Sequence, residues 1–166
     1  RWEIDPLDAA IRIIRDGDRS GKLVSFNMAE RDIAAFMRQP WVVTSSDGSE
    51  GHPRMYANFP QKYAKYVKAE HVIDLATFIN SSTGRTADMF GLADRGHLKA
   101  GYKADVVVFD PDGYRPVATY VSPRELTVGV DALFVNGQQA IREGKPTGRA
   151  AGRALRHTPP PGSCPA

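Results

Sequence analysis

The first third of the chain alternates between two kinds of apolar pattern. Residues 6–16 and 29–38 carry apolar side chains at helical spacing, and Asp5 is placed to cap the first of these helices. Residues 22–27 and 41–44 are short apolar runs of the kind found in buried strands. Helix and strand in alternation are typical of βα units around a parallel sheet, so the pattern predicts part of an α/β barrel.

Farther along the chain the pattern changes from helices to short strands. Residues 49–60 are rich in Gly, Pro and small polar residues, and we expect a loop there. Two helices are predicted next, over 61–68 and 71–81, with a helical turn over 86–90. Short strands are predicted at Leu98, 104–109, 118–120, 132–136 and 139–142, with Asn136-Gly137 as a hairpin turn. A small β-structure is therefore expected after the barrel segment.

Composition limits how much of such a barrel the chain supplies. It has 166 residues, 42% of them hydrophobic, which suits about one domain with its own core. A complete (β/α)₈ barrel needs about 250 residues, so we expect only the last two strands or so. The net charge of +3 is small and the basic residues lack interleaved aromatics, which argues against nucleic-acid binding. No apolar run approaches the ~20 residues of a membrane span, so no membrane partner is expected.

The two ends of the chain carry less information. Cys164 is the only cysteine, so no internal disulfide is possible and the compartment stays open. We expect the cytoplasm, with the periplasm as the alternative. Because Arg1 stands where a methionine would open a translation product, we expect a proteolytic cut or a segment boundary there. The tail from Gly148 is rich in Gly, Ala and Arg and then in Pro, and is expected to wrap a surface or be disordered.

Asp47 is the first candidate for chemistry. It follows the apolar run 41–44 and precedes Gly48. An acid at the carboxyl end of a buried parallel strand lies on the face where barrel enzymes keep their active sites. Such a carboxylate can bind a metal and accept a proton from metal-bound water. The local residues alone favour an ordinary Asp-Gly turn or a helix cap, because Asp-Gly turns are common, and it is the rest of the chain that favours the catalytic interpretation.

Several segments together resemble one family. They are residues 27–30 (NMAE), 37–43 (MRQPWVV), 46–48 (SDG), 51–54 (GHPR), 94–110 (DRGHLKAGYKADVVVFD), 135–137 (VNG) and 148–153 (GRAAGR). They are similar to the D-aminoacylase, or N-acyl-D-amino-acid deacylase, branch of the amidohydrolase superfamily. The resemblance implies barrel βα units over 1–92, a composite β-sandwich segment over 93–148 and a Pro-rich tail over 149–166.

The resemblance also implies a zinc-dependent amide hydrolase and assigns roles within it. Asp47 would touch the metal and act as general base, then general acid. Arg54 would clamp the α-carboxylate of a small-molecule substrate, with a plain surface arginine as the alternative. His52 would line the mouth of the site or anchor its loop. Met28 would touch the acyl or side-chain pocket, or else belong to the core.

The family's other metal ligands have no counterpart here. His71, His97 and His157 are not arranged as ligands, and the early His-x-His pair and the mid-barrel histidines are not in this sequence. We therefore expect a companion polypeptide that carries the N-terminal barrel strands and these histidines. Two alternatives stay open: a related amidohydrolase acting on another amide, such as a dipeptide or a cyclic ureide, and a non-catalytic module that kept the fold.

Overall fold

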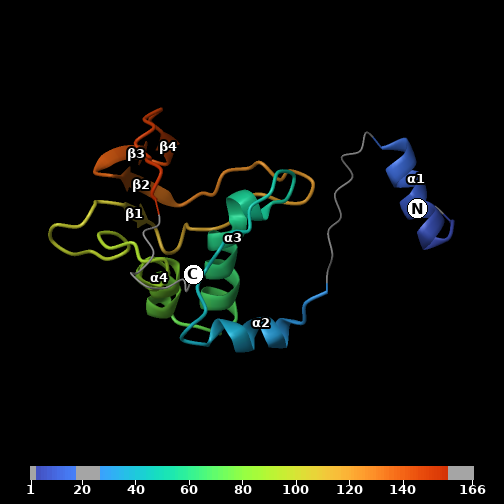
Figure 1. Ribbon diagram of the computed structural model, residues 1–166, viewed down its shortest axis with the longest axis horizontal. Coiled ribbons are helices and arrows are strands. Elements are labelled where there is room, and N and C mark those ends of the chain that lie inside the picture. Colours follow the sequence, from blue (N-terminus) through green and yellow to red (C-terminus); the bar gives the residue numbers. More distant parts are fainter. Residues whose placement is uncertain (1–2, 18–26, 157–166) are drawn as a thin grey trace, which may run out of the picture. The chain divides into compact units, whose positions relative to one another are not determined.

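The computed structural model describes residues 3–17 and 27–156. The chain divides into two compact units, Arg1–Asp32 and Ile33–Ala166, which are described separately (Figure 1). In the described part, no helix is both long and apolar enough to cross a membrane.

The first unit contains α1 (Pro6–Asp16), as predicted. The Asp5 side chain accepts a hydrogen bond from the Leu7 N–H, and Pro6 occupies the first helical position, where its missing N–H costs nothing. One face of α1 is apolar and its leucine and isoleucines are at least half exposed: Leu7, Ile11, Ile13 and Ile14. The strand predicted over 22–27 falls almost entirely outside the described residues.

The second unit holds the other helices, and three predicted boundaries were wrong. The helices are α2 (Glu30–Met37, which begins just before the unit), α3 (Arg54–Lys62), the π-helix η1 (Tyr63–Ala69), α4 (Leu75–Ser82) and α5 (Gly84–Met89). The segment 49–60 is therefore a loop only as far as residue 53. The helix predicted from residue 61 begins at Arg54 instead, and the helix predicted from residue 71 begins at Leu75. Pro53 and Pro60 hid the start of α3, because prolines usually mark breaks.

A hydroxyl group compensates for the proline inside α3. Pro60 has no N–H, so the carbonyl of Tyr56, four residues earlier, loses its helical partner. The Thr127 hydroxyl donates to that carbonyl at 2.5 Å. The helix can therefore continue through Pro60, because a residue far along the chain satisfies the freed backbone group.

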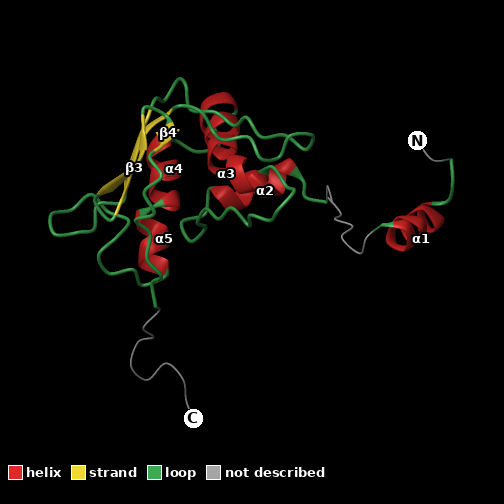
Figure 2. Ribbon diagram, turned by 90° about the horizontal axis from the view of Figure 1, so that it is seen from above, coloured by secondary structure: helices red, strands yellow, loops and turns green. Residues whose placement is uncertain are grey.

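The strands form one antiparallel sheet in the order β1-β2-β3-β4 (Figure 2). Their bounds are β1 (Val106–Phe109), β2 (Val130–Val135), β3 (Gln138–Arg142) and β4 (Lys145–Pro146). The predicted hairpin is confirmed: Asn136 and Gly137 have φ of 50° and 78°, as a type I′ turn requires. The strands predicted at Leu98 and 118–120 were wrong, because neither segment pairs with a neighbour within the described residues.

Two of the motifs singled out in the sequence, the segments 94–110 and 135–137, are hydrogen-bonded to each other beside this sheet. Asp105 accepts hydrogen bonds from the Asn136 N–H, at 2.8 Å, and from the Arg95 guanidinium. Arg95 also donates to the Asn136 side-chain oxygen at 2.6 Å. Burial alone would raise the pKa of Asp105, but these bonds outweigh it and hold that pKa below its usual value. The segments 94–110 and 135–137 are therefore joined by a shared charged network.

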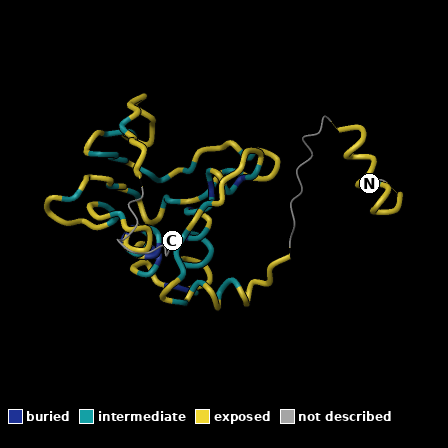
Figure 3. Tube along the Cα trace, viewed as in Figure 1, coloured by how far each residue is buried: buried dark blue, intermediate teal, exposed yellow. Residues whose placement is uncertain are grey.

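The core is small and centred on Tyr63. Tyr63, Ile73 and Phe78 are buried, and the Tyr63 ring contacts Phe109 of β1 at 5.9 Å between centroids. Buried positions are few, and most of the described trace is intermediate or exposed (Figure 3). The Tyr63 hydroxyl donates to the Pro111 carbonyl at 2.9 Å. The aromatic cluster therefore packs the end of α3 and the start of η1 against the sheet.

The strand predicted over 41–44 was also wrong. A strand exists only when a neighbour pairs with it, and within the described residues no strand lies beside this segment. The segment instead makes a long-range backbone hydrogen bond to α4, from the Thr44 N–H to the Ser81 carbonyl, at 2.9 Å. The described fold is α/β, with helices and an antiparallel sheet.

The role of Thr127 can be tested by a double-mutant cycle. Thr127→Val leaves the half-buried Tyr56 carbonyl without its donor and should lower the free energy of unfolding by about 1–2 kcal/mol. In a Pro60→Ala background the same change should cost clearly less, because residue 60 regains an N–H for that carbonyl. Urea unfolding of the four proteins measures the coupling. Additive effects of the two substitutions would contradict this account of α3.

Candidate active site

Asp47 lies in a short turn that two serines shape. The Ser45 hydroxyl accepts from the Asp47 N–H at 3.4 Å, and the Ser46 hydroxyl accepts from the Gly48 N–H at 3.3 Å. Asp47 has a φ of 45°, in the left-handed region that aspartate tolerates better than most residues. Its side chain is 82% exposed. The turn therefore presents the carboxylate to solvent instead of burying it in a cap.

Three side chains of α3 hold the segment that leads to Asp47. Arg54, Asn58 and Lys62, here called the polar stripe, are spaced four residues apart and share one helix face. Lys62 donates to the Thr44 hydroxyl at 2.6 Å, and Asn58 donates to the Ser45 carbonyl at 2.7 Å. Arg54 Nη2 lies 2.9 Å from Asp47 Oδ2. The segment 44–47 thus runs antiparallel to α3 and is bound at three points.

Lys62 is the most deeply placed member of the polar stripe. It also donates to the Ser81 hydroxyl at 3.1 Å, and Ser81 is 1% exposed. The Thr44 hydroxyl is in turn 2.9 Å from the Ser82 hydroxyl. Burial, and secondarily the charge of Arg85, lowers the pKa of Lys62 to about 8.

The Asp47–Arg54 ion pair does not fix the segment by itself. With Asp47 so exposed, water screens the pair, and such pairs contribute only about 0.2–1 kcal/mol. The hydrogen bonds from the half-buried Lys62 are stronger candidates, since bonds from a charged donor contribute about 1.5–3 kcal/mol. Arg54 Nε is buried and has no hydrogen-bond partner among the described residues. The guanidinium therefore keeps a donor beyond the one that Asp47 uses.

His52 lies just before α3 and contacts both the backbone of that helix and a pocket. Its Nδ1 accepts from the Arg54 N–H at 3.1 Å, so its ring proton is on Nε2. Burial and then the charge of Arg54 lower its pKa, against an opposing effect of Asp47. The ring meets Tyr120 edge-on at 5.2 Å between centroids. His52 thus anchors the start of α3 and also faces a pocket.

That pocket has a volume of about 420 Å³ and lies beside the polar stripe. It is lined by His52, Pro53, Arg54, Ala57, Asn58, Gln61, Ala118, Thr119 and Tyr120. Residues 118–120, predicted as a strand, instead form an irregular wall opposite α3. One side of the pocket thus carries the Arg54 guanidinium, and the other carries an aromatic ring.

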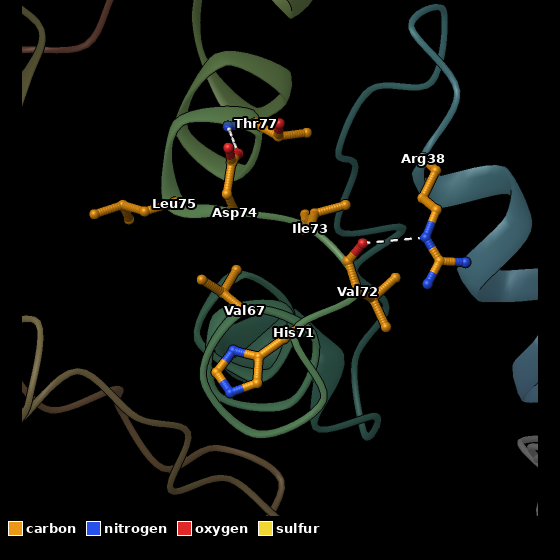
Figure 4. A pocket seen from close by; sticks show the side chains of 8 residues that line it. All are labelled: Arg38, Val67, His71, Val72, Ile73, Asp74, Leu75 and Thr77. Carbon is orange, nitrogen blue, oxygen red and sulfur yellow. Dashed lines mark hydrogen bonds between the residues drawn. The ribbon is translucent and has the colours of Figure 1, made fainter.

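A second pocket, of about 510 Å³, lies between α2 and the start of α4 (Figure 4). Two of its polar side chains already make hydrogen bonds within the fold: Asp74 accepts from the Thr77 N–H at 2.7 Å, and Arg38 donates to the Val72 carbonyl at 3.2 Å. His71 lines the same pocket with a φ of 51°. We find no convergent set of reactive groups among these lining residues.

The described residues fit a metal as one ligand and not as a complete site. No group of three or more His, Cys, Asp or Glu side chains gathers anywhere in residues 3–17 and 27–156. Asp47 offers an accessible carboxylate, which suits zinc, but a zinc ion takes about four ligands. His97 is bound to Asp88 at 2.9 Å, far along the chain from Asp47. His157 lies outside the described residues.

Met28 belongs to the first unit and is described with it. It lies two residues before the start of α2, and it is 77% exposed, so within that unit it is not a core residue. The structure thus brings together Asp47, Arg54 and His52, whereas Met28 belongs to the other unit. Sequence reasoning missed Asn58 and Lys62. The only available signal was that Arg54, Asn58 and Lys62 follow one another at intervals of four residues.

The sequence matches the family described as Amidohydrolase family over residues 12–141. It is 37% identical to a D-aminoacylase of Alcaligenes xylosoxydans xylosoxydans over 139 residues, which are 81% of this chain and 29% of that protein. An N-acyl-D-glutamate deacylase of the same organism is 32% identical over 160 residues, 94% of this chain and 32% of that protein. The chain thus spans less than a third of the length of these relatives.

Solved structures are similar over the same part. A crystal structure of D-aminoacylase superposes with a TM-score of 0.72 at 36% identity, covering 77% of this chain and 28% of that one. The N-acyl-D-glutamate deacylase of Bordetella bronchiseptica, complexed with zinc and a phosphonate mimic of the tetrahedral intermediate, superposes with a TM-score of 0.65 at 32% identity. That match covers 72% of this chain and 27% of the other.

Proposed function

The chain belongs to the amidohydrolase family, in agreement with the predicted resemblance to D-aminoacylases, and from this we propose that it forms part of a zinc-dependent enzyme that hydrolyses N-acyl-D-amino acids. The observation that carries the proposal is the position of Asp47 and Arg54. A proton-accepting carboxylate and a carboxylate-binding guanidinium lie 2.9 Å apart beside a pocket of about 420 Å³. An N-acyl-amino acid needs both groups close together, because its scissile amide is one carbon from its carboxylate.

Asp47 would be one ligand of the zinc. When bound, zinc supplies a water whose pKa is lowered to about 7, so that hydroxide is available at neutral pH. The Asp47 carboxylate is accessible to such an ion because its side chain is 82% exposed. In the working enzyme the metal would thus bind Asp47 and the substrate would bind Arg54, in place of the ion pair that these two residues make with each other.

Asp47 moves the proton in this proposal. It would accept a proton from the attacking water as the carbon–oxygen bond forms. It would then donate that proton to the amide nitrogen as the carbon–nitrogen bond breaks, because the amine leaves poorly as an anion. Arg54 binds the α-carboxylate through two N–H groups, which fixes the amide relative to Asp47. His52, bonded to the Arg54 backbone, lines the mouth of the site.

We also propose that the remaining metal ligands come from polypeptide outside this chain. Asp47 supplies one ligand, and relatives of the family are about three times as long. Residues 1–92 would then be the last βα units of the barrel, 93–148 the segment of a composite β-sandwich and 149–166 a tail. Large exposed apolar side chains, among them Phe36, Trp41 and Leu98, would be covered by the companion polypeptide.

Asp47→Asn tests the proton transfer. In the active enzyme it should lower kcat for an N-acetyl-D-amino acid by ~10²-fold or more, because the amide cannot accept the proton. Asp112→Asn is the matched control, since Asp112 is also an exposed carboxylate paired with a cation of the same helical stretch, Lys68. The control should keep wild-type turnover. Near-normal kcat in Asp47→Asn would rule out the role.

Arg54→Met tests the carboxylate clamp. For substrates with a free α-carboxylate it should lower kcat/KM by a factor that corresponds to a loss of about 2–4 kcal/mol in transition-state stabilisation. For the α-amide analogue, which offers no anion, kcat/KM should change little. Arg31→Met, at a position 88% exposed, controls for the loss of one arginine. Equal losses for acid and amide substrates would refute the clamp and favour a related amidohydrolase with a different substrate.

Residues 1–166 purified alone test the need for a companion polypeptide. We expect aggregation or weakly cooperative unfolding and no bound zinc, because one carboxylate does not hold the ion and apolar surface is exposed. Thermal unfolding, light scattering and metal analysis measure these properties. A monomeric, cooperative, zinc-loaded protein would contradict the proposal.

A further inference from the structure

We propose that Lys62 and Asn58 are positioning residues that hold the segment 44–47 on α3 and thereby aim the Asp47 carboxylate. This inference rests on the proposed function of Asp47. Both side chains donate within the fold: Lys62 bonds to the Thr44 and Ser81 hydroxyls, and Asn58, which also lines the pocket of about 420 Å³, bonds to the Ser45 carbonyl.

The geometry of the polar stripe matches the segment that it holds. From Lys62 to Arg54 the helix rises about 12 Å, at about 1.5 Å per residue. From Thr44 to Asp47 an extended chain covers about 10 Å, at about 3.3 Å per residue. The two lengths are similar, so the contacts at Thr44, Ser45 and Asp47 can be spread along the helix between Lys62 and Arg54.

Lys62 has no evident alternative task. Among the described residues its hydrogen bonds go to hydroxyl groups and not to a carboxylate, and its ammonium lies 5.9 Å from the centre of the Phe78 ring. Placing a cation there disfavours its charged form, as its lowered pKa of about 8 reflects. The unfavourable burial of this ammonium group must be compensated by an interaction, and the hydrogen bond to the Thr44 hydroxyl at 2.6 Å is one.

The way these residues act determines which kinetic constant changes. Thr44 and Ser45 lie three and two residues before Asp47, so releasing them lets the carboxylate move while Arg54 still binds the substrate. A misplacement of about 1 Å reduces turnover strongly, by up to ~10²-fold. Loss of the stripe contacts should therefore lower kcat and leave KM nearly unchanged.

The test uses three variants and a control in the active, zinc-loaded enzyme. Lys62→Met and Asn58→Leu each remove a donor while keeping a similar shape, and should lower kcat by about tenfold or more with KM and zinc content near wild type. Lys62→Arg restores a charged donor and should recover most of the loss. Lys65→Met makes the same chemical change in η1, where Lys65 is 3.9 Å from Glu70, and should leave kcat unchanged.

A readout independent of activity is the amide exchange of residues 44–48. Protection of these amides should fall in Lys62→Met and in Asn58→Leu, and should stay at the wild-type level in Lys65→Met. Wild-type kcat and wild-type protection in either stripe variant would overturn the positioning role of that residue. Failure of Lys62→Arg to restore turnover would overturn the role of the charged donor.

Failure of this inference is distinct from failure of the proposed function. If the proposed function is wrong, wild-type enzyme loaded with zinc does not release amine from an N-acyl-D-amino acid, yet the exchange pattern still reports on the polar stripe. If the positioning role is wrong, wild-type turnover is normal and the stripe variants share it.

The dependence of stability on pH gives a further check on the site of Lys62. Its folded pKa of about 8 lies below the ordinary 10.5, so between these values the unfolded chain binds more protons than the folded one. The stability of wild type relative to Lys62→Met should therefore rise from pH 8 to pH 10. The charged group facing it is Arg85, which keeps its charge over this range. A stability difference that does not change with pH would overturn the placement of Lys62.

Discussion

Lys62 places an ammonium group against hydroxyls in a half-buried part of the helical unit, and this contact determines where the segment before Asp47 can lie. The Thr44 hydroxyl accepts the hydrogen bond from Lys62 and also lies within hydrogen-bond distance of the Ser82 hydroxyl. The Thr44 N–H donates to the Ser81 carbonyl. The segment is thereby held between α3 and α4. Four residues farther back on α3, Asn58 holds the next carbonyl, and Arg54 meets the carboxylate itself.

This arrangement needs a continuous and well-anchored α3, and two features support it. Thr127 satisfies the carbonyl that Pro60 leaves free, so the helix continues through a residue that usually interrupts helices. Tyr63, at the junction with η1, packs against Phe78, Phe109 and Tyr114 and binds the Pro111 carbonyl. The helix that carries the polar stripe is therefore tied to the antiparallel sheet by aromatic contacts and by hydrogen bonds.

The site combines a rigid support with an exposed reactive group. Asp47 is accessible and takes a left-handed backbone conformation, while its supports lie deeper, down to Ser81 at 1% exposure. A carboxylate that exchanges one partner for another during a reaction must be accessible, and its supports must not move with it. In the proposed deacylase, Asp47 serves the metal and the proton, and the polar stripe of α3 keeps it in place.

The sequence by itself determined features whose signals lie within a few neighbouring residues. Asp5 and Pro6 predicted the start of α1, Asn136-Gly137 predicted the hairpin, and the motifs around Asp47 and Arg54 predicted both the family and the two residues that the structure places in contact. Local rules were misleading where a distant residue decided the outcome. The prolines of α3 indicated a loop because nothing nearby shows that Thr127 will satisfy the Tyr56 carbonyl. Residues 41–44 indicated a strand, yet a strand depends on a neighbour that the local sequence does not specify. Asn58 fell in the predicted loop and Lys62 in the predicted helix over 61–68. Neither was singled out, because the hydroxyls and the carbonyl that they bind lie more than ten residues away along the chain. Only the tertiary structure brings these partners together and shows which polar face is exposed to water and which holds the site.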